Sequence, residues 1–189
     1  MIARPVDRGM PPSLLGMTLF VSSEVMFFGA LFASYFLLRA TTSPWPPDGS
    51  LETSLVLPAM LTVCLLSSSA TVHAGAAAAR AGNRGAAARW LGLTIALGAA
   101  FLGGQIYEYS GLASEGFSAS TDVFSSLFFT LTGFHGLHVA VGLVMLVAVF
   151  LRIGRYGADR SGPVEAVSYY WHFVDAVWVL VFLTLYVLR

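Results

Sequence analysis

The apolar residues of this chain fall into five long runs separated by short polar segments. The first run extends from Leu14 to Leu38, and the others lie at about 52–78, 89–109, 123–151 and 164–188. At about 1.5 Å of rise per residue, a helix of about 20 residues crosses a hydrocarbon core of about 30 Å. The pattern predicts an all-α integral membrane protein. Its five transmembrane helices are expected to form a bundle and to span about 13–39, 52–78, 89–109, 123–151 and 164–188.

Composition agrees with a membrane protein and limits the other classes. The chain is 57% hydrophobic and only 11% charged, against about a quarter of charged residues in a soluble domain. The spans and short loops use the whole chain, so residues 1–189 are expected to form a single membrane domain. The formal net charge is zero, and no basic patch with interleaved aromatic residues suggests a nucleic-acid partner. The only cysteine, Cys64, excludes an internal disulfide and a cysteine metal cluster.

Arginine is distributed unevenly over the loops. Eight of the ten basic residues lie in the N-terminal segment, the second loop or the fourth loop: Arg4, Arg8, Arg80, Arg84, Arg89, Arg152, Arg155 and Arg160. The positive-inside rule assigns such segments to the cytoplasm. We therefore expect the N-terminus to be cytoplasmic and the C-terminus to be outside, with the loop from Gly111 to Asp122 facing outward.

Glu24 is the only charged side chain in the first apolar run, and it lies near the predicted bilayer midplane. A charged residue at the centre of a membrane helix costs about 2.5 to 3.5 kcal/mol on insertion scales. Desolvation disfavours the charged carboxylate, so Glu24 is expected to be neutral or to share a proton at neutral pH. Ionisable groups inside membranes commonly have functions, and we interpret Glu24 as a proton-handling or lipid-handling residue.

Two later spans carry polar residues at a comparable depth. His135 and His138 are three residues apart in the fourth span, and His172 and Asp175 have the same spacing in the fifth, so each pair lies on one helix face. With Glu24 these residues form a predicted intramembrane polar layer that handles protons or lipids. The alternative is that they are buried hydrogen-bonding groups that fix the contacts between helices.

The polar residues do not match a metal site. The HxxH pattern presents both imidazoles from one helix face, and a dinuclear carboxylate site would need paired Glu-x-x-His helices. The thiolate ligands of copper electron-transfer sites are missing as well. We therefore predict no metal ligand and no redox cofactor in this chain.

Three segments together resemble one protein family. SSEVMFFGALFASYF in the first span, GFHGLHVAVG in the fourth and YYWHFVDAVWVLVF in the fifth resemble subunit III of the haem-copper oxidases, most closely the cytochrome c oxidase branch. The resemblance covers roughly residues 12–189. The usual form of that family has seven transmembrane helices, and this chain looks like the five-helix form that lacks the first two.

The resemblance implies a subunit III of an aerobic terminal oxidase, with haem and copper held by partner subunits and no catalytic residue in this chain. It implies packing against the catalytic subunit I in a complex with subunit II, bound phospholipid, and support of proton uptake and of resistance to inactivation during turnover. The buried glutamate of the family matches Glu24, and its motif histidines and aspartate match His135, His138, His172 and Asp175. The expected location is the prokaryotic cytoplasmic (inner) membrane, and a larger respiratory supercomplex stays open.

Two alternatives remain at this point. A quinol oxidase subunit, or the related protein that accompanies nitric oxide reductases, would share these motifs, although the EVMFF and WHFVD segments favour the cytochrome c type. The second alternative is an independent transporter that couples transport to proton movement through the layer from Glu24 to Asp175. The two halves of the chain show no internal repeat of the kind that is common in transporters, which weakens this alternative.

Overall fold

The computed structural model describes residues 12–51, 54–155 and 161–188, and within them the chain is all-α. Five helices are long and apolar enough to cross a membrane, which confirms the predicted number of spanning helices. They are α1 (Pro12–Thr41), α2 (Val56–Arg80), α3 (Arg84–Ser114), α4 (Val123–Leu151) and α5 (Gly162–Phe182). A 3-10 turn, η1 (Ile153–Arg155), follows α4, and a π-helical segment, η3 (Leu183–Val187), continues α5.

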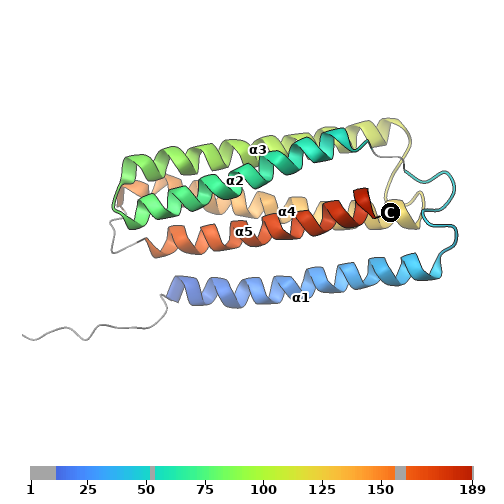
Figure 1. Ribbon diagram of the computed structural model, residues 1–189, viewed down its shortest axis with the longest axis horizontal. Helices are drawn as coiled ribbons and strands as arrows, with labels where there is room; N and C mark the ends of the chain where they lie inside the picture. The colour runs from blue at the N-terminus through green and yellow to red at the C-terminus, as the bar shows by residue number, and fades with distance from the viewer. Residues whose placement is uncertain (1–11, 52–53, 156–160, 189) are drawn as a thin grey trace, which may run out of the picture.

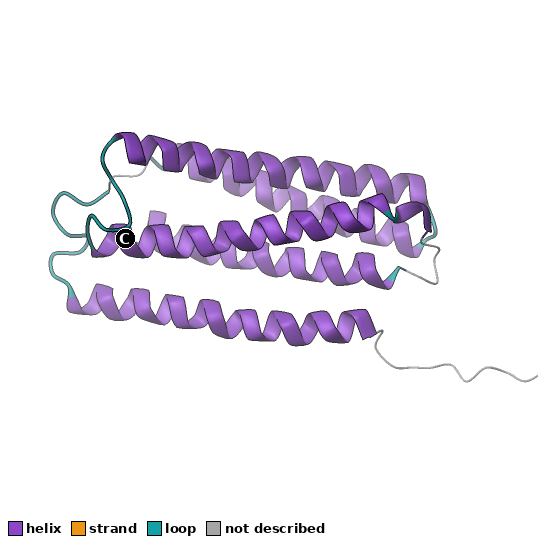
Figure 2. Ribbon diagram, turned by 180° about the vertical axis from the view of Figure 1, so that it is seen from behind, coloured by secondary structure: helices purple, strands orange, loops and turns teal. Residues whose placement is uncertain are grey.

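Successive helices run in opposite directions, so the α2–α3 and α4–α5 connections lie at one end of the bundle and the other two connections at the opposite end (Figure 1). Figure 2 shows the bundle from behind, with helix through its whole length and loops confined to the ends. Helix α5 is central, since it packs against α1, α2 and α4. This arrangement places residues of α1, α2 and α4 beside α5.

Helix α1 is attached to the bundle by a narrow stripe. Its buried residues are Val21, Phe28 and Tyr35, which are spaced by seven and therefore lie on one face. Only 11% of its apolar window is buried, the smallest share among the five helices. Most of α1 is therefore available to lipid or to another protein.

Glycine permits close packing around the large indole of Trp171 at the centre of the bundle. A Cβ atom added to Gly98 of α3 would come within 2.7 Å of the Trp171 ring, and one added to Gly142 of α4 within 2.8 Å. Helices in membranes associate largely by such van der Waals packing. Trp171 is fully buried as a result.

Helices α2 and α3 begin at other residues than the predicted spans. Helix α3 extends beyond the predicted 89–109 in both directions, because the Asn83 side chain caps its first turn and Gly116, at φ 87°, allows the chain to turn after its last. Helix α2 begins at Val56, with Pro58 in its first turn. The start of the predicted second span at 52 lies outside the described residues.

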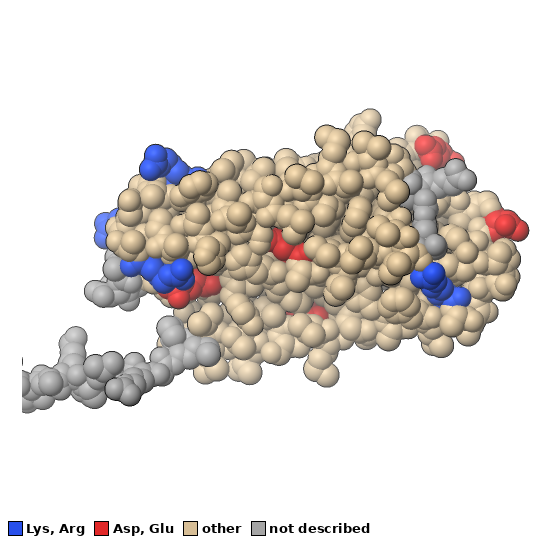
Figure 3. Space-filling model, in the orientation of Figure 1, with Lys and Arg blue, Asp and Glu red and all other residues tan. Residues whose placement is uncertain are grey.

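Basic side chains gather at one end of the bundle, where α2 meets α3, and a belt that is largely free of charge separates them from the other end (Figure 3). The described arginines of the α2–α3 and α4 ends are Arg80, Arg84, Arg89 and Arg152, while Arg39 ends α1 on the opposite side. Arg4, Arg8 and Arg160, which contributed to the predicted topology, lie outside the described residues. The orientation of the bundle across the membrane stays a prediction.

Candidate functional site

Glu24 of α1 forms an ion-pair contact with His138 of α4 in the middle of the bundle. The Glu24 Oε2 atom lies 3.0 Å from His138 Nε2, and the side chains are 19% and 13% exposed. His138 Nδ1 lies 2.7 Å from the Phe134 carbonyl oxygen, which only accepts hydrogen bonds, so Nδ1 carries hydrogen and donates. The bond to Glu24 then needs one more proton, on Glu24 or on Nε2. The contact therefore joins α1 to α4 through one hydrogen bond.

Aromatic side chains surround this pair. The Phe28 ring lies 4.9 Å from the His138 ring, centre to centre, and the Phe27 ring stacks on it at 6.2 Å. Tyr170 of α5 donates a hydrogen bond to the His138 carbonyl oxygen at 3.1 Å. An apolar surrounding strengthens a hydrogen bond between polar groups and makes the loss of one partner costly.

His172 and Asp175 lie on the other side of α5, toward α2. His172 Nδ1 is 2.6 Å from the Ser69 hydroxyl oxygen, and its ring centre is 6.3 Å from that of His73. Asp175 is 3% exposed, and neither carboxyl oxygen has a hydrogen-bond partner among the described residues. The α5 pair is thus built around α2, separate from the contact between Glu24 and His138.

His135 has a third environment. It is fully buried between the Phe101 ring of α3, at 5.7 Å, and the Trp178 ring of α5, at 4.9 Å. Neither ring nitrogen has a hydrogen-bond partner within the described part of the chain. Of the five predicted site residues, the structure brings Glu24 and His138 into direct contact.

Sequence reasoning missed a third carboxylate inside the bundle, Glu108 of α3. Its oxygens accept hydrogen bonds from the Tyr186 hydroxyl at 3.1 and 3.2 Å, and Gln105 Nε2 donates to Oε2 at 3.3 Å. The predicted third span ended at Tyr109, so Glu108 was assigned to the end of a span. The spacing of three between Gln105 and Glu108 was the available signal, because it places them on one face of α3.

Asp122 fixes the start of α4, just outside the spanning segment. It accepts hydrogen bonds from the Ser125 amide at 2.9 Å and hydroxyl at 2.6 Å, and from the Ser50 hydroxyl at 3.2 Å. Partial burial opposes ionisation, but these hydrogen bonds outweigh it and hold the pKa of Asp122 below its ordinary value. Asp122 thereby ties the α1–α2 loop to the first turn of α4.

The described residues contain no group of three or more histidine, cysteine or acidic side chains placed to hold a metal ion. The absence of a metal from the functional protein stays a prediction. Glu24, His138 and His172 are engaged in hydrogen bonds, and His135 packs against aromatic rings.

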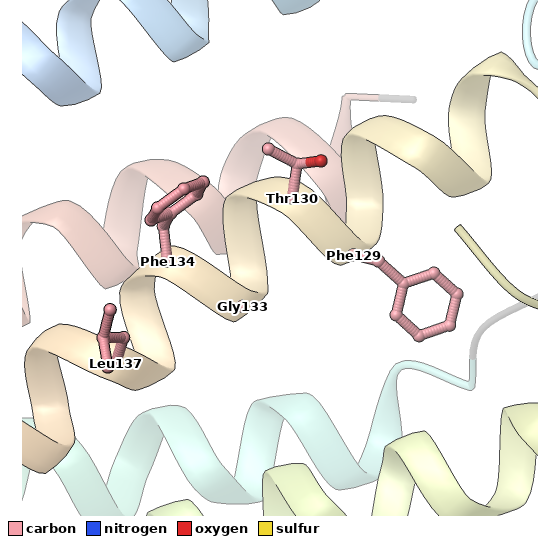
Figure 4. A pocket seen from close by; sticks show the side chains of 5 residues that line it. All are labelled: Phe129, Thr130, Gly133, Phe134 and Leu137. Carbon is pink, nitrogen blue, oxygen red and sulfur yellow. The ribbon is translucent and has the colours of Figure 1, made fainter. Parts of the chain in front are cut away.

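Two apolar hollows open on the sides of the bundle. One, of about 230 Å³, lies on α4 where Gly133 leaves a gap between the side chains of Phe129, Thr130, Phe134 and Leu137 (Figure 4). The other, of about 280 Å³, lies between α1 and α5. Its lining is Val25, Phe28, Gly29 and Phe32 from α1 and Phe173, Ala176, Val177 and Leu180 from α5. Phe28 also contacts His138, so this hollow adjoins the pair formed by Glu24 and His138.

Comparisons with known proteins cover almost the whole chain. The family model described as "Cytochrome c oxidase subunit III" matches residues 3–189. The cytochrome c oxidase subunit 3 of Thermostichus vulcanus is 42% identical over 178 residues, which are 93% of this chain and 87% of that protein. The corresponding protein of Synechocystis sp. is 40% identical over 178 residues, 93% of this chain and 75% of its own. A probable cytochrome c oxidase subunit 3 of Nocardia farcinica is 42% identical over 178 residues, with shares of 93% and 87%.

Proposed function

The chain belongs to the cytochrome c oxidase subunit III family and is a membrane subunit of that oxidase complex; we propose that it stabilises the catalytic subunit and sustains its proton uptake. The observation that carries this proposal is the 3.0 Å contact between Glu24 and His138, a hydrogen bond that needs one proton between the two side chains. Its homologues are bacterial, and we place the chain in the cytoplasmic (inner) membrane with its N-terminus inside. Subunits I and II are its proposed immediate partners.

The geometry of the pair suits proton handling. A carboxyl group and an imidazole that share one proton can pass between the neutral pair and the ion pair by moving that proton over a bond of 3.0 Å. Such a step avoids leaving an isolated charge in an apolar surrounding, which would be costly. The carboxylate belongs to α1, the helix with the least buried surface, so a partner that covers α1 would lie close to the pair.

A bound phospholipid is part of the proposal. The hollow between α1 and α5 has only apolar and glycine residues in its lining, which suits an acyl chain because each methylene group removed from water contributes about 0.8 kcal/mol. Phe28 lines the hollow and touches His138. An acyl chain held there would restrict the movement of α1 and keep water from the pair formed by Glu24 and His138.

Purification of the tagged chain in a mild detergent tests the proposed assembly. We expect subunits I and II to co-purify in equal amounts, together with a haem absorption spectrum and phospholipid that resists delipidation. The control for detergent carry-over is an unrelated membrane protein with five spans, which carries the same tag and is purified from the same cells in the same way. Recovery of this chain alone and colourless would contradict the proposed role.

A further inference from the structure

Two buried polar side chains inside the bundle have atoms without a hydrogen-bond partner within the described residues. His135 of α4 is fully buried with both ring nitrogens unpaired, and Gln105 of α3 is 3% exposed with its Oε1 atom unpaired. The Gln105 amide nitrogen is already used, since it donates to Glu108. Leaving one buried donor or acceptor without a partner costs about 1 to 3 kcal/mol. Native proteins satisfy nearly all such atoms, with protein groups or ordered water.

Phe101 of α3 is a neighbour of both side chains. Phe101 lies one helical turn before Gln105 on α3, and its ring packs edge-on against His135 at 5.7 Å. Trp178 of α5 closes this region, at 4.7 Å from Phe101 and 4.9 Å from His135. The Trp178 indole N–H donates to the Thr62 hydroxyl at 2.9 Å, so that donor is engaged elsewhere. The unpaired atoms must find a partner that is not one of these neighbours.

The unpaired atoms define the chemistry of that partner. A neutral imidazole offers one donor and one acceptor, and Gln105 Oε1 is an acceptor only. A small uncharged molecule that both donates and accepts satisfies this set, and water is such a molecule. We propose that α3, α4 and α5 enclose an ordered water site bounded by His135 and Gln105. Through Gln105 the site continues to Glu108 and Tyr186, whose hydrogen bonds are in place.

This water site is separate from the pair on which the proposed function rests. His138 is engaged by Glu24 of α1 and by the Phe134 carbonyl, whereas His135 contacts rings of α3 and α5. The site therefore lies within the part of the bundle formed by α3, α4 and α5. A result that contradicts the role in proton uptake would therefore leave the proposed water site unaffected.

X-ray radiolytic labelling of the full chain in lipid nanodiscs tests the proposal directly, because radicals formed from bound water oxidise adjacent side chains. We expect Phe101 to be oxidised although it is fully buried, and Gln105→Leu to lower its oxidation rate several-fold. Thr94→Val is the matched control, since Thr94 is a buried α3 residue with its hydrogen bonds satisfied. An unoxidised Phe101, or equal rates in Gln105→Leu and the wild type, would overturn the proposal.

A double-mutant cycle gives a second, independent measurement. Thermal unfolding is followed by a thiol-reactive dye at Cys64, the only cysteine, for His135→Phe, Gln105→Leu and the double variant. Residues that share a water network are coupled, so the double variant should lose clearly less melting temperature than the sum of the two single losses. Additive losses would mean that His135 and Gln105 share no water and would count against the site.

Discussion

Replacing Glu24 with glutamine separates a proton-handling role from a purely structural one. In the structure, His138 Nδ1 donates to the Phe134 carbonyl, so Nε2 of a neutral ring accepts from residue 24 at 3.0 Å. A glutamine amide N–H donates the same hydrogen bond but carries no proton to transfer. We expect Glu24→Gln to keep the subunit in the complex and to shorten the period over which the oxidase sustains its turnover.

Glu24→Ala is the contrasting change. It leaves His138 Nε2 without a partner in an aromatic surrounding, at a cost of about 1 to 3 kcal/mol. Helix α1 has few other buried residues, namely Val21, Phe28 and Tyr35, so much of this cost falls on its attachment to the bundle. If all of it appears in association with the complex, the affinity falls by about 5- to 150-fold.

The assay combines subunit retention after detergent purification, oxygen consumption over many turnovers, and infrared spectroscopy of the protonated carboxyl band. Ser22→Ala is the matched control on α1, because Ser22 is exposed and its hydroxyl bonds only to the Thr18 carbonyl of the same helix. If Glu24→Gln turns over as long as the wild type and removes no carboxyl band, Glu24 is a packing residue. The proton-handling part of the proposal would then fail.

Three further predictions concern topology, metal content and the loop end of the bundle. In a Cys64→Ala background, cysteines at Asn83 and Gly116 should react with an impermeant reagent from opposite sides of the membrane; reaction of both from one side would refute the predicted topology. Elemental analysis of the purified chain should find far less than one iron, copper or zinc per molecule, and a stoichiometric metal lost on His138→Ala would contradict this. Asp122→Ala should lower unfolding stability by about 0.5 to 2 kcal/mol through loss of the α4 cap. Because the folded-state pKa of Asp122 is depressed, its stabilisation is present above the unfolded pKa of about 4 and is lost as pH falls through the folded value. Thermal unfolding of the wild type should therefore show an acid-sensitive component that Asp122→Ala lacks, and identical pH profiles would disprove this account.

The five helices followed from the sequence because the length of an apolar run is a direct physical requirement for crossing a bilayer. Helix ends were less predictable, since the backbone stays helical beyond the apolar run wherever a cap satisfies its end. Helix α3 shows this at both ends, with Asn83 capping its start and Gly116 following its last turn. Hydropathy alone contains no information about either cap.

The partners of the site residues depended on helix rotation, which the sequence did not give. His135 and His138 share a face by spacing, yet three residues still separate two side chains by about 60° around a helix. That rotation is enough for His138 to meet Glu24 of α1 while His135 meets Phe101 of α3. Glu108 was missed for a related reason, because its partner Tyr186 lies far along the chain, in the π-helical segment after α5.

The two polar clusters differ in what surrounds them, and this decides how each should respond to change. Glu24 belongs to α1 and contacts His138 of α4, and most of the α1 surface is not covered by the rest of the chain. His135 and Gln105 are both buried, and His135 lies beside the fully buried rings of Phe101 and Trp178. A partner subunit or lipid that covers α1 therefore acts on the first cluster and not on the second. Substitutions at Glu24 should alter the behaviour of the assembled oxidase, whereas substitutions at Gln105 should alter the stability of the isolated chain to the same extent with or without partners.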